Sequence, residues 1–463
     1  MKRMNVAFLV VLMMLTAILP ATAFAAEETV MSWSELKAAL ADTTVDSIVL
    51  GADLEVTEKL TVSHPVTIDG NGHSIKRVNA YNGIMLDVNA DLDMTDLVID
   101  GQNNWTFDQA GADAALADPA YSSPDCSYVT AEPGAPVNTV RGAHIYVRAN
   151  MTIDGVTIKN IYSGVSVSIF AVVDNGNLDM TGATIQHVAA EHEAVVLLIN
   201  SATGTATIGP GTTITDIYGN RNGVVSRINS GTLYMTGGTV SNVNAINSNG
   251  SVFMMYQGTL EMSGGTISDN IAYGGPNNDF AGTVYVHKNG KLHMTGGSII
   301  NNTGRHTGGV LVRPNAGKVD IEDGLVTGNT AIASGYEEFD DVYVFEAEKI
   351  ELTGGTYSQE PAEEWIAEGY VAYDNNDGTW TVMLLSEVPT PTPSPTPVAA
   401  TPTPVAPTAT PAPAAPAAPV APTATPAPAP KTGDSTNLAL WMGLIVISGM
   451  VLLGLGKKAK AGK

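Results

Sequence analysis

The chain of 463 residues contains a single cysteine, Cys126, and therefore cannot form an intramolecular disulfide bond. Basic residues are also scarce, because 22 Lys and Arg stand against 46 Asp and Glu and give a formal net charge of −24. This excess of carboxylates argues against nucleic acid or an anionic lipid surface as a partner. The fold must rest on main-chain hydrogen bonds and a packed interior.

Helical periodicity is absent from the repeating part of the chain, where an element similar to Met-Thr-Gly-Gly returns instead. The apolar residues that open each copy are separated by 27, 28, 27, 27, 32, 27 and 31 residues. They are Met151, Leu178, Ala206, Leu233, Leu260, Leu292, Val319 and Ile350. A nearly fixed interval of this size predicts a solenoid.

Residue types within each copy predict short strands. Segments such as Leu233-Tyr234-Met235 alternate apolar and polar residues, glycine pairs such as Gly237-Gly238 follow, and β-branched pairs such as Thr239-Val240 resume the chain. Leucine-rich repeats need a Leu and Asn pattern with a helical return segment, and propeller blades need about 40 residues each. We therefore predict an all-β parallel β-helix with a rise of about 4.8 Å per turn.

Both ends of the predicted solenoid carry candidate caps. Residues Trp33, Leu36, Ala39 and Leu40 have helical spacing after the N-cap candidate Ser32, which predicts a short amphipathic helix over the first turn. At the other end, Asp377-Gly378 lies between alternating segments from Tyr370 to Met383 and predicts a closing hairpin.

Composition divides the chain into four regions. Residues 1–25 carry Lys2 and Arg3, an apolar stretch and a small-residue site, which together predict a secretory signal peptide. The solenoid is expected over residues 27–385. A linker over 386–430 follows, and its 16 prolines in the 42 positions from Pro389 to Pro430 predict a disordered, semi-rigid stalk of roughly 130 Å.

The last region, residues 430–463, has three parts in a fixed order. Pro430-Lys431-Thr432-Gly433 is followed by an apolar span from Leu438 to Gly456, expected to be a transmembrane helix, and then by four lysines. This order resembles the LPXTG-like sorting signal of Gram-positive surface proteins, with Ala429 in place of the usual Leu. The resemblance implies cleavage between Thr432 and Gly433 by a sortase and covalent attachment to peptidoglycan on the extracellular face. A plain membrane anchor is the alternative.

The segment Asp69-Gly70-Asn71-Gly72-His73-Ser74-Ile75 and the strands predicted around it resemble the first turns of pectate-lyase-like domains. The likeness extends through the Met-Thr-Gly-Gly copies to about residue 385. It implies a right-handed parallel β-helix. In Gram-positive surface proteins that carry such a tail, it implies an adhesive domain more often than a lyase.

An enzyme of this fold would need carboxylates on neighbouring turns, with Ca²⁺ and a base for a lyase or paired carboxylates for a hydrolase. The outward residues between the Leu and Met positions are scattered in charge. Only Glu261, His293, Asp320 and Glu351 fall on successive turns, where they could share a cation or a proton. The same pattern is expected of a solvated face, and no cofactor other than a possible Ca²⁺ is implied.

Two further sets of residues recur with the repeat. Asn160, His187, Asp216, Asn242, Asp269 and Asn301 follow the buried Ile or Val by two positions, which predicts a structural role at bends. The third segment of the repeat supplies aromatic and basic side chains suited to sugar rings or an extended peptide. These ligand-binding candidates are Tyr146, Arg148, Arg227, Tyr285, His287, Arg313 and Tyr343, with Phe345 beside them.

One insertion interrupts the repeat, because Leu92 and Met151 are 59 residues apart, about twice the usual interval. Residues Gln102 to Thr139 could form a binding loop or a disordered flap. Taken together, the sequence predicts a cell-wall-anchored adhesin that binds host or environmental glycans or proteins through the lateral face of the solenoid. The alternative is a surface lyase or glycoside hydrolase acting on acidic polysaccharide.

Overall fold

The structure is a computed structural model that describes residues 26–78, 81, 83–117, 128–137, 144–164, 168–190, 196–219, 223–246, 250–274, 281–333 and 339–389. These residues belong to one compact unit. The predicted signal peptide, Cys126, the linker after Pro389 and the sorting signal with its apolar span lie outside the described residues. Across the described ranges, none of the helices has the length and hydrophobicity that crossing a bilayer requires.

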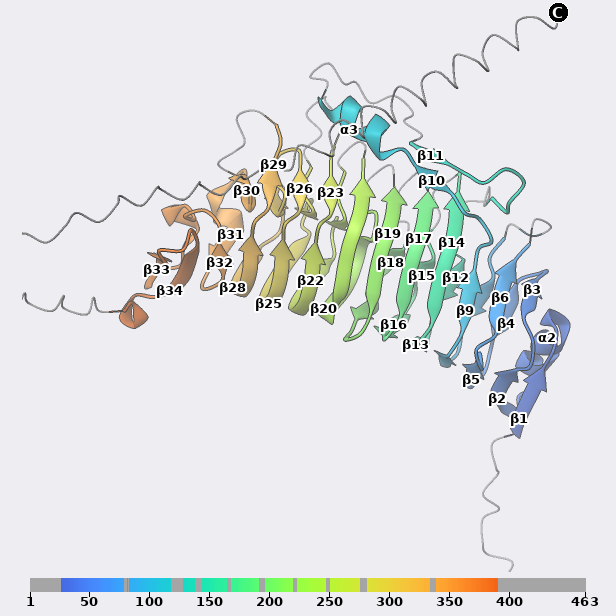
Figure 1. The fold of residues 1–463 in the computed structure, drawn as a ribbon. Coiled ribbons are helices and arrows are strands. Elements are labelled where there is room, and N and C mark those ends of the chain that lie inside the picture. Colours follow the sequence, from blue (N-terminus) through green and yellow to red (C-terminus); the bar gives the residue numbers. More distant parts are fainter. Residues whose placement is uncertain are drawn as a thin grey trace, which may run out of the picture. The chain divides into compact units, whose positions relative to one another are not determined.

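The described chain winds into a parallel β-solenoid, which is the fold that the sequence predicts. Strands from successive turns lie side by side in a row, and each pairs in parallel with the strand one turn before and one turn after it (Figure 1). Each turn passes through a first, a second and a third face, which we number from the opening strand of the repeat.

The first face contains the opening strands, and its register is the predicted one. Met151 pairs with Leu178, Leu233 with Leu260, and Val319 with Ile350. Its strands are β1 (Ala26–Val30), β2 (Val45–Leu50), β5 (Val66–Asp69), β8 (Leu92–Thr95), β13 (Asn150–Asp154), β16 (Asn177–Thr181) and β31 (Ile350–Leu352), with parts of β18 (Leu197–Ile208), β20 (Ser226–Ala245), β22 (Thr259–Ser268), β25 (Lys291–Ile300) and β28 (Val319–Thr327).

The long strands β20, β22, β25 and β28 continue around a glycine corner into the second face. The other strands of the second face are β3 (Leu54–Val56), β6 (Ser74–Arg77), β9 (Val98–Asp100), β14 (Thr157–Ser163), β17 (Thr184–Ala190), β19 (Thr213–Gly219), β23 (Ile271–Ala272), β26 (Thr303–Gly304), β29 (Thr330–Ala331) and β32 (Thr356–Tyr357).

The third face begins with β4 (Leu60–Val62) and ends with β30 (Val342–Val344). Between them lie β7 (Leu86–Val88), β12 (Ile145–Val147), β15 (Phe170–Val172), the first residues of β18 and β20, β21 (Phe253–Met255), β24 (Val284–Val286) and β27 (Val310–Val312). The inward side chains of all three faces form one continuous apolar core. Burying each of these side chains contributes roughly 1.5–3 kcal/mol before the entropy cost is subtracted.

Both predicted caps are present. Helix α2 (Trp33–Ala41) begins after Ser32, whose hydroxyl accepts a hydrogen bond from the Glu35 N–H, and it buries Trp33 and Leu36 against the first turn. At the other end, β33 (Tyr370–Asp374) and β34 (Trp380–Leu384) form the predicted antiparallel hairpin, and β34 also pairs with β32. The short helices η2 (Ala347–Lys349), η3 (Glu363–Trp365) and η4 (Leu385–Glu387) accompany this end.

The corners explain the recurring glycines and polar residues. The six polar residues predicted at bends, Asn160, His187, Asp216, Asn242, Asp269 and Asn301, all have φ between 53° and 57°. Asn and Asp tolerate this left-handed conformation better than other non-glycine residues, which confirms the structural role. At the glycine corner, a Cβ added to Gly264 would lie 2.6 Å from the carbonyl oxygen of Thr236 in the turn below.

A ladder of buried asparagines lies next to the polar bends in the last turns, where Asn270 follows Asp269 and Asn302 follows Asn301. The side-chain amide of Asn270 donates to Asn302 Oδ1 over 2.9 Å, that of Asn302 donates to Asn329 Oδ1 over 3.0 Å, and that of Asn329 donates to Asp341 Oδ1 over 3.0 Å. Burial raises the pKa of Asp341, although hydrogen bonds from Asn329 and Ser358 oppose this. The sequence does not predict this ladder.

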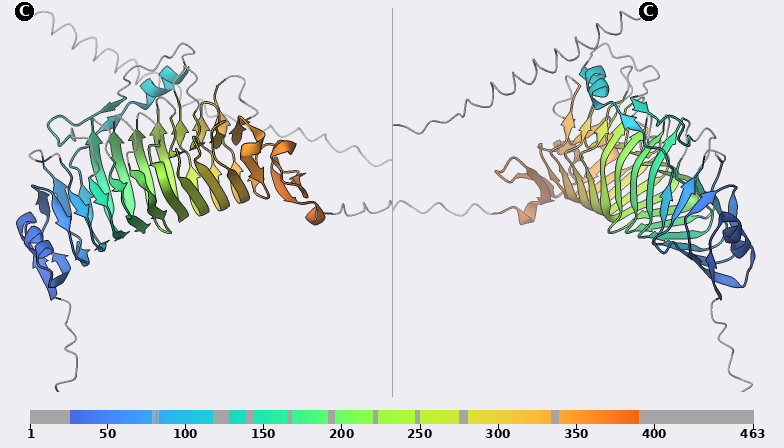
Figure 2. Two further views of the ribbon diagram at one scale, coloured as in Figure 1. Left: turned by 180° about the vertical axis from the view of Figure 1, so that it is seen from behind. Right: turned by 45° about the vertical axis from the view of Figure 1, so that its right-hand side comes forward.

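The described part of the insertion packs against the solenoid. It forms β10 (Thr106–Phe107), α3 (Gln109–Ala117) and β11 (Val129–Thr130), which run along one edge of the row of strands (Figures 1 and 2). The Trp105 ring stacks on His187 with centroids 4.3 Å apart, and its Nε1 donates to the His187 carbonyl oxygen over 3.1 Å. Trp105 and Val129 bury an apolar column that includes Tyr162 and Tyr218. The insertion is thus a packed cover in the residues described.

Candidate functional site

The outward residues of the third face form a single column. Tyr146 pairs with Asp87 on one side, Tyr285 pairs with Met254 and Leu311, and Tyr343 follows Leu311. Arg227 belongs to the same column because it pairs with Met254. The flanking side chains, such as Val284 and Val286, point into the core. The register that places these ligand candidates on the outside is therefore the one observed.

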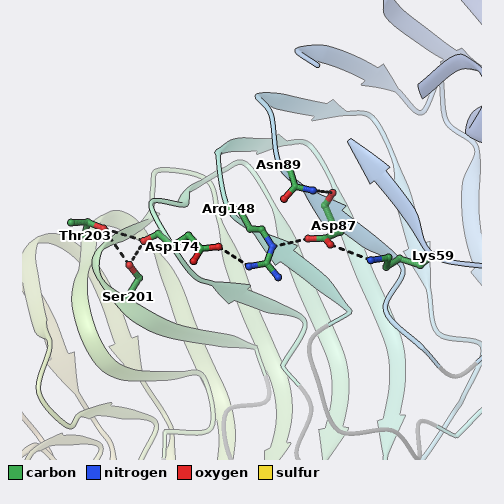
Figure 3. A network of polar contacts seen from close by, with 7 residues as sticks. All are labelled: Lys59, Asp87, Asn89, Arg148, Asp174, Ser201 and Thr203. Carbon is green, nitrogen blue, oxygen red and sulfur yellow. Dashed lines mark hydrogen bonds and ion pairs between the residues drawn. The ribbon is translucent and has the colours of Figure 1, made fainter. Parts of the chain in front are cut away.

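Arg148 lies toward the N-terminal end of this face, in a network of ion pairs that spans consecutive turns (Figure 3). Its Cζ also lies 5.3 Å from the centroid of the Tyr146 ring. Arg148 Nε donates to Asp87 Oδ1 over 2.9 Å, and its Nη1 donates to Asp174 Oδ2 over 2.6 Å. Lys59 donates to the other oxygen of Asp87 over 3.2 Å. Hydrogen bonds to Asp87 and Asp174 raise the pKa of Arg148. This guanidinium thus connects three consecutive turns through its two ion pairs.

The remaining candidates gather at the C-terminal end of the third face with residues that the sequence does not single out. We call this group the third-face cluster; it comprises Arg227, Tyr256, Tyr285, His287, Lys288, Arg313, Tyr343 and Phe345. Cations lie near both of its main rings, with Lys288 Nζ 4.5 Å and Arg227 Cζ 5.5 Å from the Tyr256 centroid. Arg313 Cζ lies 4.8 Å from the Phe345 centroid.

Rings of the cluster pack against each other both between turns and within one turn. The Tyr256 and His287 centroids are 5.5 Å apart, and those of Tyr343 and Phe345 are 5.0 Å apart. Lys288 Nζ donates to the Tyr256 hydroxyl over 3.2 Å. Tyr256 occupies the same position after β21 that His287 occupies after β24, so alignment of Met255 with Val286 would have revealed it from the sequence.

Burial divides the cluster into a base and a surface. Tyr285 is only 1 % exposed and packs with Met254 and Leu311 in a small second core, so it supports the cluster and is not a contact residue. Tyr256, Tyr343 and Phe345 are partly buried against it. Burial, with Arg313 and Lys288 nearby, lowers the pKa of His287, and burial also lowers the pKa of Arg227. The His287 ring is therefore neutral at pH 7.

The four candidates on the first face do occupy successive turns but form two separate groups. His293 Nδ1 bonds to Glu261 Oε2 over 2.7 Å, and its Nε2 bonds to Glu322 Oε1 over 3.1 Å. Hydrogen bonds to Glu261 and Glu322 raise the pKa of His293. Lys318 pairs with Asp320 over 2.8 Å and also with Glu351. Each of the four side chains is thus held by an ion pair on a solvated face.

Within the described ranges, no three His, Cys, Asp or Glu side chains are grouped so that they could hold a metal ion. That part of the chain therefore offers no candidate ligands for the Ca²⁺ ion that the sequence left possible. The sorting-signal residues Pro430, Lys431, Thr432 and Gly433 lie outside it.

Comparison with known proteins gives a family match in the N-terminal part of the solenoid. Residues 27–132 match a family described as "Putative pectate lyase-like adhesive domain". The matched residues contain α2, the first turns and much of the insertion, whereas the third-face cluster lies beyond them. No curated protein and no solved structure matches the chain.

Proposed function

We propose that the protein is a surface adhesin that binds glycan or protein ligands on the third-face cluster. The observation that carries this proposal is the collection of cations and rings at Tyr256 and Phe345 in a chain whose formal net charge is −24. The match of residues 27–132 to an adhesive domain supports the same function. Binding on an open lateral wall would need no enclosed pocket.

The geometry favours an acidic ligand over a neutral one. Arg227, Lys288 and Arg313 already lie over the faces of Tyr256 and Phe345, so the cluster offers ammonium and guanidinium groups more than open ring faces. Carboxylate and sulfate groups are the natural partners of such cations. Uronate-containing or sulfated glycans, or an acidic protein segment, are therefore the ligands we expect.

A glycan array tests this function with the purified protein. Wild-type protein is expected to bind acidic glycans in preference to neutral ones, and Lys288→Glu should weaken that binding about three- to tenfold. Lys291→Glu makes the same change of charge on an exposed residue of the first face and should bind as the wild type does. Equal loss in both variants, or no preference for acidic glycans, would contradict the proposal.

We further propose that the protein is exported and covalently attached to the cell wall. The N-terminal apolar stretch and the ordered Pro-Lys-Thr-Gly, apolar and basic parts of the tail support this. In a Gram-positive host, Thr432→Ala should move the protein from the wall fraction to the membrane fraction. Retention of the variant in the wall fraction would rule out attachment through Thr432.

A further inference from the structure

The last strand of the third face has an edge that no described strand covers. On one side β30 pairs with β27. The chain then completes β31 and β32 but does not return to the third face. Leu352 of β31 is bridged by Ile366, and β32 is covered by β34. In the part of the chain that the structure describes, no strand pairs with β30 on its other side.

The main chain of β30 presents hydrogen-bonding groups on that open side. The Asp341 carbonyl oxygen accepts from Val310 N–H over 2.8 Å, and Phe345 N–H donates to the Val312 carbonyl oxygen over 3.1 Å. These residues face β27. Because main-chain groups alternate along a parallel strand, the N–H and C=O groups of Val342 and Val344 point toward the open side. An edge of this kind is a template for one more strand.

A groove of about 650 Å³ lies beside this edge. Val342 and Val344 line it, together with residues of the segment from Gln359 to Trp365 that follows β32. Phe345 and Trp365 contribute aromatic surface. The groove is the place where the next third-face strand would lie if the repeat continued.

Charge selects the occupant of the groove. Asp341, Glu360 and Glu364 are among its lining residues, and Glu360 and Glu364 are exposed. None of the described lining residues is basic. We propose that the groove receives an extended basic segment of a partner protein, which adds as a strand to the free edge of β30. Main-chain hydrogen bonds to Val342 and Val344 would supply affinity, and the acidic wall would select Lys and Arg side chains.

This site lies at the end of the solenoid and involves a basic partner. Phe345 belongs both to the lining of this groove and to the third-face cluster, but the variants that test the two sites are different residues, so either proposal can fail without the other.

The test uses a fluorescent synthetic peptide that alternates Val and Lys, with the purified protein. The peptide is expected to bind with an affinity that falls as salt rises, and a Val and Glu peptide of equal length should not bind. Binding should also protect the amide hydrogens of Val342 and Val344 from exchange. Undiminished binding of the Val and Glu peptide, or no protection of these amides, would overturn the proposal.

Val344→Pro is the sharpest variant, because proline removes the N–H group that points to the open side and breaks no main-chain hydrogen bond between β30 and β27. The variant should melt at a temperature close to that of the wild type. Its affinity for the peptide that alternates Val and Lys should fall about tenfold or more. Val344→Ala keeps this N–H group and serves as the control that should bind nearly as well as the wild type. Equal binding by the proline variant would exclude strand addition.

Charge reversal provides a second, independent variant. The double variant Glu360→Lys and Glu364→Lys should bind the Val and Lys peptide more weakly. The double variant Glu27→Lys and Glu55→Lys, at exposed positions near the other end of the solenoid, should bind it as the wild type does. Sedimentation of the protein without peptide tests whether a second copy of this chain occupies the edge instead. Self-association that Val344→Pro abolishes would assign the edge to a second copy of this chain and overturn the proposal.

Discussion

Polar residues at a bend stabilise the solenoid through their own backbone conformation. Asn242 is exposed and has φ of 53°, in the left-handed region. Asn242→Ala should destabilise the protein by about 1 kcal/mol, because alanine pays the Cβ penalty of this conformation, whereas Asn242→Gly should be nearly neutral. Urea denaturation of the two variants checks this. Equal effects of alanine and glycine would mean that the Asn side chain, and not φ, matters.

The buried asparagine ladder makes a stronger contribution per residue. Asn302 is fully buried and bonds through its side chain to Asn270, Asn329 and the Ile267 carbonyl oxygen. Asn302→Ala should cost about 2–3 kcal/mol of unfolding free energy, because buried partners lose their hydrogen bonds. Asn177→Ala, in a partly exposed position, should cost under about 1 kcal/mol. A similar small loss in both variants would contradict a stabilising ladder.

His306 makes stability depend on pH. Burial, with Arg305 and Arg313 nearby, lowers the pKa of His306 to about 4, and its neutral Nδ1 accepts a hydrogen bond from Ala281 N–H over 3.3 Å. The unfolded chain takes up this proton below its ordinary pKa of 6.5, so stability should fall as the pH drops from 6.5 toward 4.

His306→Asn keeps an acceptor near the Nδ1 position but does not titrate. Thermal melts across this pH range should show a smaller acid loss of stability in the variant than in the wild type. His144 and His287, whose pKa values burial also lowers, should contribute to the loss that remains. An unaltered profile in His306→Asn would remove His306 from the account.

At the residue scale, the sequence predicts positions that repeat with the interval and misses those that depend on tertiary burial. The bends at Asn160 and Asp269 stand at a fixed offset from a buried residue and were predictable. Asn270 directly follows the bend residue Asp269, and Asn302 directly follows the bend residue Asn301. Nothing in the local sequence shows whether an amide side chain at that position is buried or exposed. Their burial depends on how the corner closes over the following segment.

At the element scale, the insertion is held by a few aromatic contacts. Trp105 is 4 % exposed and stacks on His187. Trp105→Ala should cost about 3–5 kcal/mol locally and release the cover from the solenoid. Limited proteolysis should then cut within residues 102–139 much faster, while the solenoid core stays resistant. Trp380→Ala, which truncates the same side chain in β34, should leave the insertion protected.

Strands and caps were predictable because their patterns are local. The alternation of Leu233, Tyr234 and Met235 is readable within one segment, as is the helical spacing after Ser32. The place of the insertion was not predictable, because Trp105 packs on His187 and Phe107 lies beside Tyr218, far along the chain. The ligand candidates show the same dependence on distant residues. Arg148 and Arg313 have similar positions in the repeat, but the ion pairs of Arg148 with Asp87 and Asp174 could not be predicted from the local sequence.

At the scale of the whole molecule, the solenoid separates its surfaces by chemistry. The first face carries mutually paired charges, the third face carries rings and cations, and the last turn leaves a strand edge beside an acidic groove. The end of the repeat is visible in the sequence after Tyr357. The groove is not, because it arises where a strand fails to return. The two proposed sites therefore differ in the charge of the ligand that each is expected to bind.

The central claim is that this surface protein holds an acidic ligand and does not degrade it. In the most direct measurement, purified protein is passed over immobilised polygalacturonate in the presence of Ca²⁺. The eluate is then assayed for unsaturated uronates and new reducing ends. We predict retention that salt reverses, weaker retention of Lys288→Glu than of Lys291→Glu, and no products. Steady release of oligosaccharides, or retention that is indifferent to Lys288, would contradict the account.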